Sequence, residues 1–280
     1  MLKKERYNLH FPSTFPAVKL QYRSHMPSKD PFSLQGKTAL ITGASRGLGQ
    51  GMALALAQAG ARVICSSTHM GGAAVTVEKI KETGGTAAEV SGDLALSNEV
   101  ESIYDRSVAI YGSIDILVNN GGTIARYPAL EYPREEWDRV MEVNVTSAFR
   151  LSQLVAAHMK NHGGGKIINT ASMLSYSGGI NVIAYTASKH AIAGVTKALA
   201  NEWAAYNIQV NAIAPGYFRT DNTKQLQQDP VRSEEILRRI PAGRWGEPTD
   251  LDGTIVFLAS PASDYVTGII LNVDGGWMAR

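Results

Sequence analysis

The stretch that decides the fold is KTALITGASRGLGQGMALALAQAG, residues 37–60. It opens on a continuous apolar run, which is typical of a strand buried on both faces. A glycine-rich turn follows, and after it come residues that favour a helix. Glycines between a strand and a helix can allow a tight turn, a close approach to pyrophosphate and close helix packing. The segment therefore predicts a dinucleotide-binding strand–turn–helix unit, with a plain tight turn as the alternative.

The same alternation continues along the chain. Short runs rich in Val, Ile and Leu predict strands, and the longer stretches between them predict helices. The predicted strands are residues 37–42, 62–66, 86–90, 115–118, 166–170, 208–213 and 268–273, and helices are expected to begin near residues 48, 73, 97, 135, 185 and 249. Such alternation favours parallel strands joined by right-handed crossovers. We expect an α/β fold, a Rossmann-type doubly wound sheet of about seven parallel strands with helices on both faces, in one domain over residues 34–280.

Composition restricts the class of protein. Of the 280 residues, 44% are hydrophobic and 19% are charged, and the net charge of +2 gives no reason to expect a nucleic-acid partner. The sequence contains no uninterrupted run of about 18 apolar residues, so a membrane span is not predicted. Cys65 is the single cysteine, which fits a reducing, cytoplasmic compartment. No metal site is expected, because His158 and His162 lack further ligands at usable spacing. Residues 1–33 have no clear period and predict a flexible N-terminal extension.

The glycine spacing and the motifs that follow it resemble one family. Gly-x-x-x-Gly-x-Gly after Thr42 is similar to the fingerprint of the short-chain dehydrogenase/reductase family, and the resemblance covers residues 34–280. Further motifs stand in the family's order: Asp93, Asn119-Asn120-Gly121-Gly122, Asn144, Ser172, Tyr185-x-x-x-Lys189 and Pro215-Gly216. One departure is Gly121, where the family usually has alanine. The missing methyl group is expected to loosen this turn.

Tyr185 and Lys189 lie four positions apart in a helical stretch, which places them on one helix face. Carbonyl reduction needs a hydride on carbon and a proton on oxygen. A tyrosine titrates near pH 10, and a nearby ammonium lowers that pKa. The resemblance implies that Ser172 hydrogen-bonds the substrate oxygen and that Asn144 holds a water near the lysine. A bare Tyr-x-x-x-Lys pair can also be structural, and His190, one step further along, is expected to point away from the Tyr185 face.

The end of the second predicted strand bears on the choice of nicotinamide cofactor. No carboxylate stands there, and the resemblance places Ser67 at the usual acidic position. Arg46 can reach a 2′-phosphate, helped by Ser67, Thr68 and His69, so NADP(H) is favoured and NAD(H) remains possible. A merely solvated Arg46 is the alternative.

The resemblance also supplies the remaining cofactor contacts. Asp93 is expected at the adenine, with a loop cap as its alternative, and Asn119 and Gly121 are expected near the ribose. The full expected set is Gly43, Ser45, Arg46, Gly47, Leu48, Gly49, Ser67, Thr68, Asp93, Leu94, Asn120, Gly121, Tyr185, Lys189, Pro215, Gly216, Tyr217 and Thr220.

The C-terminal half resembles the sugar-acid dehydrogenases of the family in the stretches INTASMLSYSGGI, NAIAPGYFRTDNT and RIPAGRWGEP. A sugar acid needs a cation for its carboxylate, and Arg126 is the first candidate, beside Ser172 and Tyr185 at the reacting oxygen. A surface arginine is the alternative. Asn181 stands where such relatives tend to have a basic residue, and Trp245 either walls the pocket or packs structurally. Residues 218–239 are expected to form a helical flap over the substrate.

Two other functions remain open at this point. A 3-oxoacyl-acyl-carrier-protein reductase would use the same catalytic residues but would need a basic docking surface. A non-catalytic nucleotide-sensing homologue would be expected to lose the Tyr185 and Lys189 pair. The resemblance implies a homotetramer, with the helices around Val140 and Ala193 and the C-terminal segment at interfaces, and a small-molecule substrate.

Overall fold

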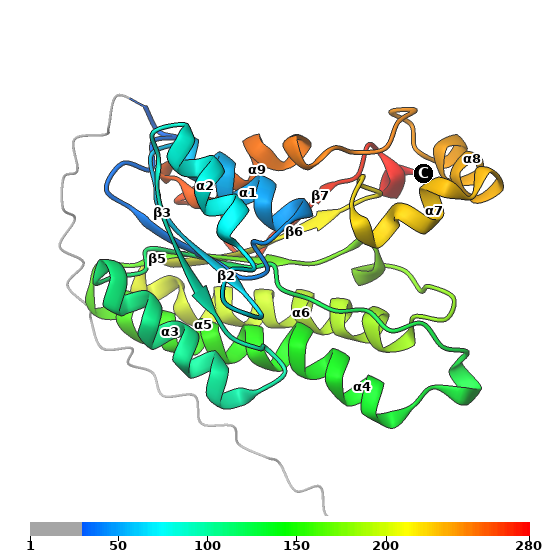
Figure 1. Ribbon diagram of the computed structural model, residues 1–280, viewed down its shortest axis with the longest axis horizontal. Coiled ribbons are helices and arrows are strands. Elements are labelled where there is room, and N and C mark those ends of the chain that lie inside the picture. The colour runs from blue at the N-terminus through cyan, green and yellow to red at the C-terminus, as the bar shows by residue number, and fades with distance from the viewer. Residues whose placement is uncertain (1–29) are drawn as a thin grey trace, which may run out of the picture. The chain divides into compact units, whose positions relative to one another are not determined.

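Seven strands form one parallel sheet in the order β3-β2-β1-β4-β5-β6-β7 (Figure 1). The computed structural model describes residues 30–280, except the side chain of Asn222. The strands are β1 Thr38–Ile41, β2 Arg62–Ser67, β3 Thr86–Ser91, β4 Ile116–Asn119, β5 Gly165–Thr170, β6 Ile208–Pro215 and β7 Ile270–Val273. All seven match predicted strands, and every neighbouring pair is parallel. The predicted doubly wound fold is therefore confirmed.

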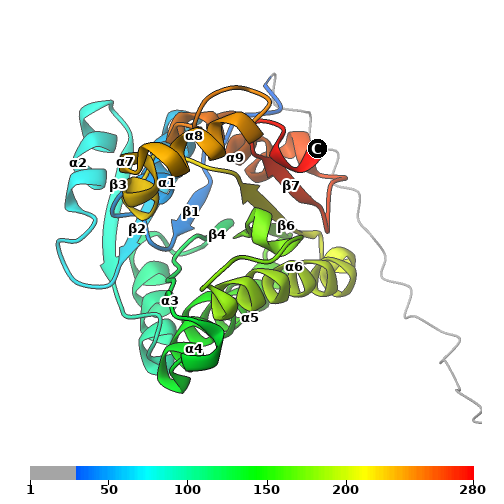
Figure 2. The same cartoon turned by 90° about the vertical axis from the view of Figure 1, so that its right-hand side faces the viewer.

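Helices cover both faces of the sheet. The main helices are α1 Gly47–Gln58, α2 Ala74–Glu82, α3 Ser97–Tyr111, α4 Arg134–Met141, α5 Ser147–Asn161, α6 Ile183–Trp203, α7 Lys224–Gln228, α8 Pro230–Arg239 and α9 Asp252–Ala259. Figure 2, an end view, shows α1, α2 and α9 on one side and α3, α5 and α6 on the other. Successive residues of β1 explain the two layers: Ile41 packs with the first group of helices, and Leu40 packs with the second. Strands buried on both faces read as continuous apolar runs.

Short turns complete the chain between these elements. They are η1 Ala129–Glu131, η2 Glu142–Thr146, η3 Met173–Ser175, η4 Ala204–Tyr206, η5 Asp221–Thr223, η6 Pro248–Leu251, η7 Pro261–Ser263 and η8 Trp277–Ala279. The element η2 is a π-helical turn that joins α4 to α5, where the sequence predicted a single helix from near residue 135. Such turns are frequent at functional sites, and this one contains Asn144.

Residues 218–239, which we call the lid segment, contain η5, α7 and α8, so the predicted helical structure is present, and the predicted covering of the substrate stays a prediction. Asp229 caps α8, since its carboxylate accepts hydrogen bonds from the N–H groups of Val231 and Arg232. An apolar cluster anchors the segment, and its buried members are Met173, Ile236, Ile240, Trp245 and Trp277.

Residues 31–280 form one compact unit. The boundary predicted at residue 34 stays a prediction, and most of the predicted N-terminal extension lies outside the described residues. Within residues 30–280, no helix is long and apolar enough to cross a bilayer. In the same range, no three His, Cys, Asp or Glu side chains are grouped as metal ligands would be.

Candidate active site

Helix α6 carries two candidate catalytic side chains one turn apart. Tyr185 is half-buried and Lys189 is buried. The Lys189 ammonium donates a 2.6 Å hydrogen bond to the backbone oxygen of Thr170, the last residue of β5. Its nitrogen lies 5.3 Å from the centre of the Tyr185 ring. The phenol and the amine therefore share one face of α6 beside the carboxyl end of β5.

Both groups have shifted pKa values, mainly because the protein removes them from water. Burial raises the pKa of Tyr185, while a hydrogen bond with Ser172 and the positive charge of Arg126 oppose that rise. Burial lowers the pKa of Lys189 to about 8. The sequence predicted that Lys189 would lower the pKa of Tyr185, but the net shift is upward and the opposing cation is Arg126. A phenol that stays protonated suits the role of proton donor.

Ser172 follows β5 and begins the turn η3. Its hydroxyl oxygen accepts a hydrogen bond from the N–H of Leu174 at 3.1 Å. Ser175, at the end of the turn, donates a 2.6 Å hydrogen bond to the backbone oxygen of Lys189. These bonds fix the turn against α6, so Ser172 is held beside Tyr185.

Asn144 is buried in the π-helical turn η2 and joins two parts of the site. Its side-chain oxygen accepts from the N–H of Thr123 at 2.8 Å, and its amide donates to the backbone oxygen of Thr123 at 2.9 Å. The amide also donates to the Ser188 hydroxyl at 3.0 Å, which in turn donates to the backbone oxygen of Tyr185 at 2.7 Å. The Asn144 side chain thus ties the segment after β4 to the catalytic helix. Its expected role of holding a water stays a prediction.

The glycine-rich turn has the shape that a diphosphate requires. Gly43 and Gly47 have φ angles of 65° and 56°, in the left-handed region that favours glycine. A Cβ at Gly49 would lie 2.2 Å from the Gly43 oxygen, so no side chain fits there. The first turn of α1 has neither a side-chain cap nor an acidic residue. Its N–H groups therefore remain available to an anion, and the residues present fit a dinucleotide.

Asn120 keeps that turn in place. Its amide donates hydrogen bonds to the backbone oxygens of Thr42 at 3.0 Å and Gly43 at 3.1 Å. Asn119 was expected near the cofactor ribose, but it is buried and its amide bonds to Asn169 and Ser152 inside the fold. Asn119 therefore supports the core rather than the cofactor.

At the adenosine end, the side chains are arranged differently from the expectation. Ser67 is buried and donates to the His69 oxygen at 2.8 Å and to the Glu89 carboxylate at 3.1 Å. Its single hydroxyl hydrogen is thus shared between two acceptors of the protein itself. Thr68 is exposed, and Arg46 forms a 3.1 Å ion pair with Asp221 of the lid segment.

The turn after β4 meets the segment after β3. Asp93 accepts a 2.9 Å hydrogen bond from the N–H of Ala95, which is the loop cap expected as the alternative to adenine binding. A Cβ at Gly121 would lie 2.5 Å from a methyl carbon of Leu94. The methyl group missing at Gly121 therefore leaves space that Leu94 fills, and the expected loosening of the turn stays a prediction.

The turn after β6 leads into the lid segment. A Cβ at Gly216 would lie 2.6 Å from the Asp274 backbone, which explains the glycine. The Tyr217 ring packs against Trp245 and Trp277, at centroid distances of 5.5 and 4.8 Å. Trp245 is buried in this cluster, so of its two predicted roles the packing role is observed. Thr220 approaches the glycine-rich turn: a Cβ at Gly47 would lie 3.6 Å from its methyl group.

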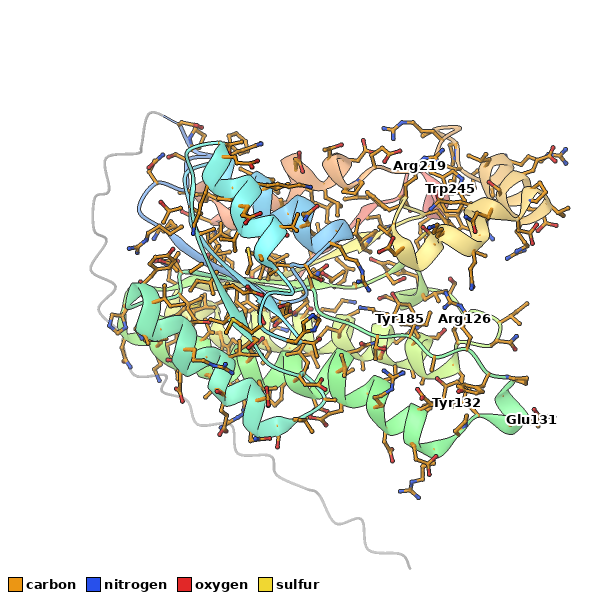
Figure 3. All side chains as sticks on the ribbon, in the orientation of Figure 1. Arg126, Glu131, Tyr132, Tyr185, Arg219 and Trp245 are labelled. Atoms are coloured by element: carbon orange, nitrogen blue, oxygen red, sulfur yellow. The ribbon has the colours of Figure 1, made fainter. Side chains whose placement is uncertain are left out.

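Arg126 lies on the segment after β4, and Figure 3 shows it beside Tyr185 with the lid segment above. Its side chain is exposed, yet its charge is close enough to oppose the rise that burial causes in the pKa of Tyr185. The N–H of Tyr127 donates a 3.0 Å hydrogen bond to the backbone oxygen of Asn181. Asn181 has a φ of 61°, in the left-handed region. This contact, which the sequence analysis missed, ties the Arg126 segment to the loop before α6.

Three of the described histidines make contacts away from the catalytic side chains. His190 is exposed on α6 and its ring nitrogen contacts the Thr186 oxygen at 3.0 Å, as expected for a surface residue. His158 and His162 stack on each other near the end of α5, with ring centroids 3.9 Å apart.

Comparison with known proteins adds three findings. The family described as enoyl-(acyl carrier protein) reductase matches residues 43–278. The 2-dehydro-3-deoxy-D-gluconate 5-dehydrogenase of Escherichia coli K12 is 54% identical over 250 residues, which are 89% of this chain and 98% of that protein. The E. coli 5-keto-D-gluconate 5-reductase is 41% identical over 249 residues, 89% of this chain and 98% of that protein.

The solved structures agree with this pattern. The gluconate 5-dehydrogenase of Burkholderia cenocepacia, crystallised in complex with NADP and tartrate, is 40% identical to the chain. Its TM-score is 0.86, and the match covers 90% of this chain and 98% of that one.

Proposed function

The chain belongs to the short-chain dehydrogenase/reductase family, and on that basis we propose that it is an NADP(H)-dependent oxidoreductase acting on a keto or hydroxy sugar acid. The observation that carries the proposal is the grouping of Ser172, Tyr185 and Lys189 with the charge of Arg126. The first three suit carbonyl chemistry, and the arginine suits a carboxylate. High identity to sugar-acid dehydrogenases over nearly their whole length supports the same substrate class.

In the reducing direction, a bound nicotinamide supplies the hydride to the carbonyl carbon. The Tyr185 hydroxyl gives its proton to the carbonyl oxygen, and the Ser172 hydroxyl donates a hydrogen bond to the same oxygen. Lys189, with a pKa lowered to about 8, can exchange a proton near neutral pH. Asn144 holds the segment after β4 against α6 through its hydrogen bonds to Thr123 and Ser188. The oxidising direction reverses these steps, with Tyr185 as the proton acceptor.

The glycine-rich turn and the free N–H groups of α1 would hold the diphosphate. Arg46 is proposed to bind a 2′-phosphate, which favours NADP(H), with NAD(H) as a second cofactor. Relatives solved with NADP support this preference. The other expected contacts, including Ser45, Leu48 and Pro215, belong to the same proposal.

Arg126 is proposed to bind the substrate carboxylate. A guanidinium matches a carboxylate with two parallel hydrogen bonds, and the exposed Arg126 side chain lies beside Tyr185. The reacting carbonyl would then lie at Tyr185 and Ser172. This arrangement favours a small acid over an acyl chain on a carrier protein.

The test follows the absorbance of NADPH and NADH with the full-length protein and a panel of ketoacids. The panel holds 2-dehydro-3-deoxygluconate, 5-ketogluconate, an uncharged ketose and acetoacetyl thioesters. Oxidation of NADPH by one sugar ketoacid, abolished in Tyr185→Phe, is the expected result. Turnover of the thioesters alone would show a 3-oxoacyl reductase, and cofactor binding without any turnover would show a nucleotide-sensing homologue.

We further propose that the protein is a cytoplasmic homotetramer. Large apolar side chains are exposed on α4 and α5 at Trp137 and Phe149, and near the edge strand β7 at Tyr265 and Ile269. Association would remove these surfaces from water. Light scattering of the eluting protein should give four times the mass of the chain, and a monomer in solution would refute the assembly.

A further inference from the structure

One ion pair joins the glycine-rich turn to the lid segment. The Nε of Arg46, which precedes α1, lies 3.1 Å from a carboxylate oxygen of Asp221 in the turn η5. The two side chains are 75% and 68% exposed, so water and solutes reach both. An exposed pair of this kind can exchange partners at small cost. A phosphate that approaches Arg46 therefore competes with the Asp221 carboxylate.

The turn that carries Asp221 is fastened by bonds other than that pair. The Thr223 hydroxyl donates to the Phe218 oxygen at 2.5 Å, and the N–H of Thr220 donates to the Thr223 hydroxyl at 3.2 Å. The N–H of Arg219 donates to the Gly246 oxygen at 2.7 Å. These bonds hold the backbone around Asp221 in place without help from Arg46.

Arg46 is also the main cation that this part of the chain offers to a 2′-phosphate. It is the only Lys or Arg in the glycine-rich turn, residues 42–49, and in the end of β2 with the turn after it, residues 65–72. Ser67 carries no charge, and its hydroxyl hydrogen is shared between the Glu89 carboxylate and the His69 oxygen. Whatever neutralises Arg46 therefore weakens the attraction for a 2′-phosphate more than for a free hydroxyl.

We propose that Asp221 is a specificity-determining residue for the cofactor: its carboxylate occupies the Arg46 guanidinium, which the 2′-phosphate of NADP(H) must take over, and so lowers the preference for NADP(H) over NAD(H). The inference rests on the proposed function, which assigns the nucleotide to the glycine-rich turn. NAD(H) has no 2′-phosphate and can leave the pair of Arg46 and Asp221 intact. Each NADP(H) that binds must first separate the lid carboxylate from the turn.

The test measures binding by calorimetry on the full chain, without turnover. The ligands are two matched pairs that differ by the 2′-phosphate: adenosine 2′,5′-bisphosphate against 5′-AMP, and NADP⁺ against NAD⁺. The proteins are wild type, Asp221→Asn, Arg46→Ala and the double variant. Glu234→Gln is the control. It also removes a carboxylate from the lid segment, but that carboxylate is paired with Arg238 and not with Arg46. Thermal unfolding of each protein confirms that it is folded.

Asp221→Asn is expected to tighten the binding of both 2′-phosphate ligands by about five-fold, the scale of an exposed ion pair, and to leave 5′-AMP and NAD⁺ unchanged. In the Arg46→Ala background the same substitution should have little effect, and Glu234→Gln should have none. Equal changes for both members of a ligand pair, or the same tightening without Arg46, would overturn the inference. Binding of none of the ligands by the wild type would instead refute the proposed function.

Discussion

Lys189→Met is expected to abolish turnover and at the same time to remove a pH-dependent loss of stability. The Lys189 side chain is buried, and its pKa is lowered from 10.5 to about 8. A shift of this size means that the charged form costs roughly 3 kcal/mol in the folded state relative to the unfolded chain. The loss of the hydrogen bond to the Thr170 oxygen opposes the gain by roughly 1–2 kcal/mol, and any change of this bond on deprotonation is already contained in the pKa shift.

The sign follows from proton linkage. Between the folded pKa of about 8 and the unfolded value of 10.5, the unfolded chain binds more protons at this site, so stability rises with pH. The stability is fully present above the unfolded pKa and is lost as the pH falls through the folded pKa. From pH 7 to pH 9.5, the wild type should gain roughly 2 kcal/mol from Lys189, and the methionine variant should gain nothing at this site.

The measurement is urea unfolding followed by tryptophan fluorescence at several pH values between 7 and 9.5. Groups that titrate in both proteins cancel in the difference between their free energies of unfolding. That difference, variant minus wild type, should fall steadily as the pH rises. Lys197→Met is the control, since Lys197 is exposed on the same helix, and its difference should be flat. A flat difference for Lys189→Met would refute the assignment of a costly buried ammonium.

Three further predictions concern the rest of the site. Arg126→Gln should raise the KM for the sugar ketoacid about ten-fold or more and leave the KM for an uncharged ketose unchanged. An equal change of both KM values in steady-state kinetics would contradict carboxylate binding by Arg126. Asn181→Gly should keep the KM for the sugar ketoacid, because glycine readily adopts the φ of 61° found at this position. Asn181→Val should raise that KM and reduce stability by roughly 1–2 kcal/mol, because valine is strained at this φ. Equal urea unfolding and equal KM for the two variants would contradict the role of this backbone conformation. Gly49→Ala should abolish NADP⁺ binding in calorimetry, because its Cβ would lie 2.2 Å from the Gly43 oxygen. Gly194→Ala is the control and should bind NADP⁺ normally, because open space surrounds that position. Retained binding in Gly49→Ala would show that the glycine-rich turn can shift to accept a side chain.

The strands and most helices were predictable because burial on two faces gives a continuous apolar run and burial on one face gives a helical period. The π-helical turn at Asn144 was not, because one extra residue in a turn leaves the apolar pattern of α4 and α5 almost unchanged. The pairing of Tyr185 with Lys189 was predictable from a local spacing. The pKa values were not, because they depend on burial and on Arg126, which lies far away in sequence.

Contacts between loops mark the same limit. Asn is the residue, after glycine, that most readily adopts a positive φ, but nothing in the sequence indicates that Asn181 does so or that its oxygen binds Tyr127. Likewise, Ser67 stands at the position that matters for the cofactor, yet its orientation depends on Glu89 from the neighbouring strand. A one-dimensional pattern gives the residue type but not its partner.

On the proposed function, the preference between NADP(H) and NAD(H) depends on three carboxylate positions rather than one. The acid that would bind a free ribose hydroxyl is missing at Ser67, which permits a 2′-phosphate. Glu89 lies directly behind that position, but its carboxylate accepts hydrogen bonds from Ser67 and from the N–H of Ala73 next to α2, which compensates its charge. Asp221 is the carboxylate that has only the exposed Arg46 as its ion-pair partner among the described residues. Because that arginine is also the cation for the 2′-phosphate, the position where a single charge change should move the preference most is Asp221 in the lid segment, not the end of β2.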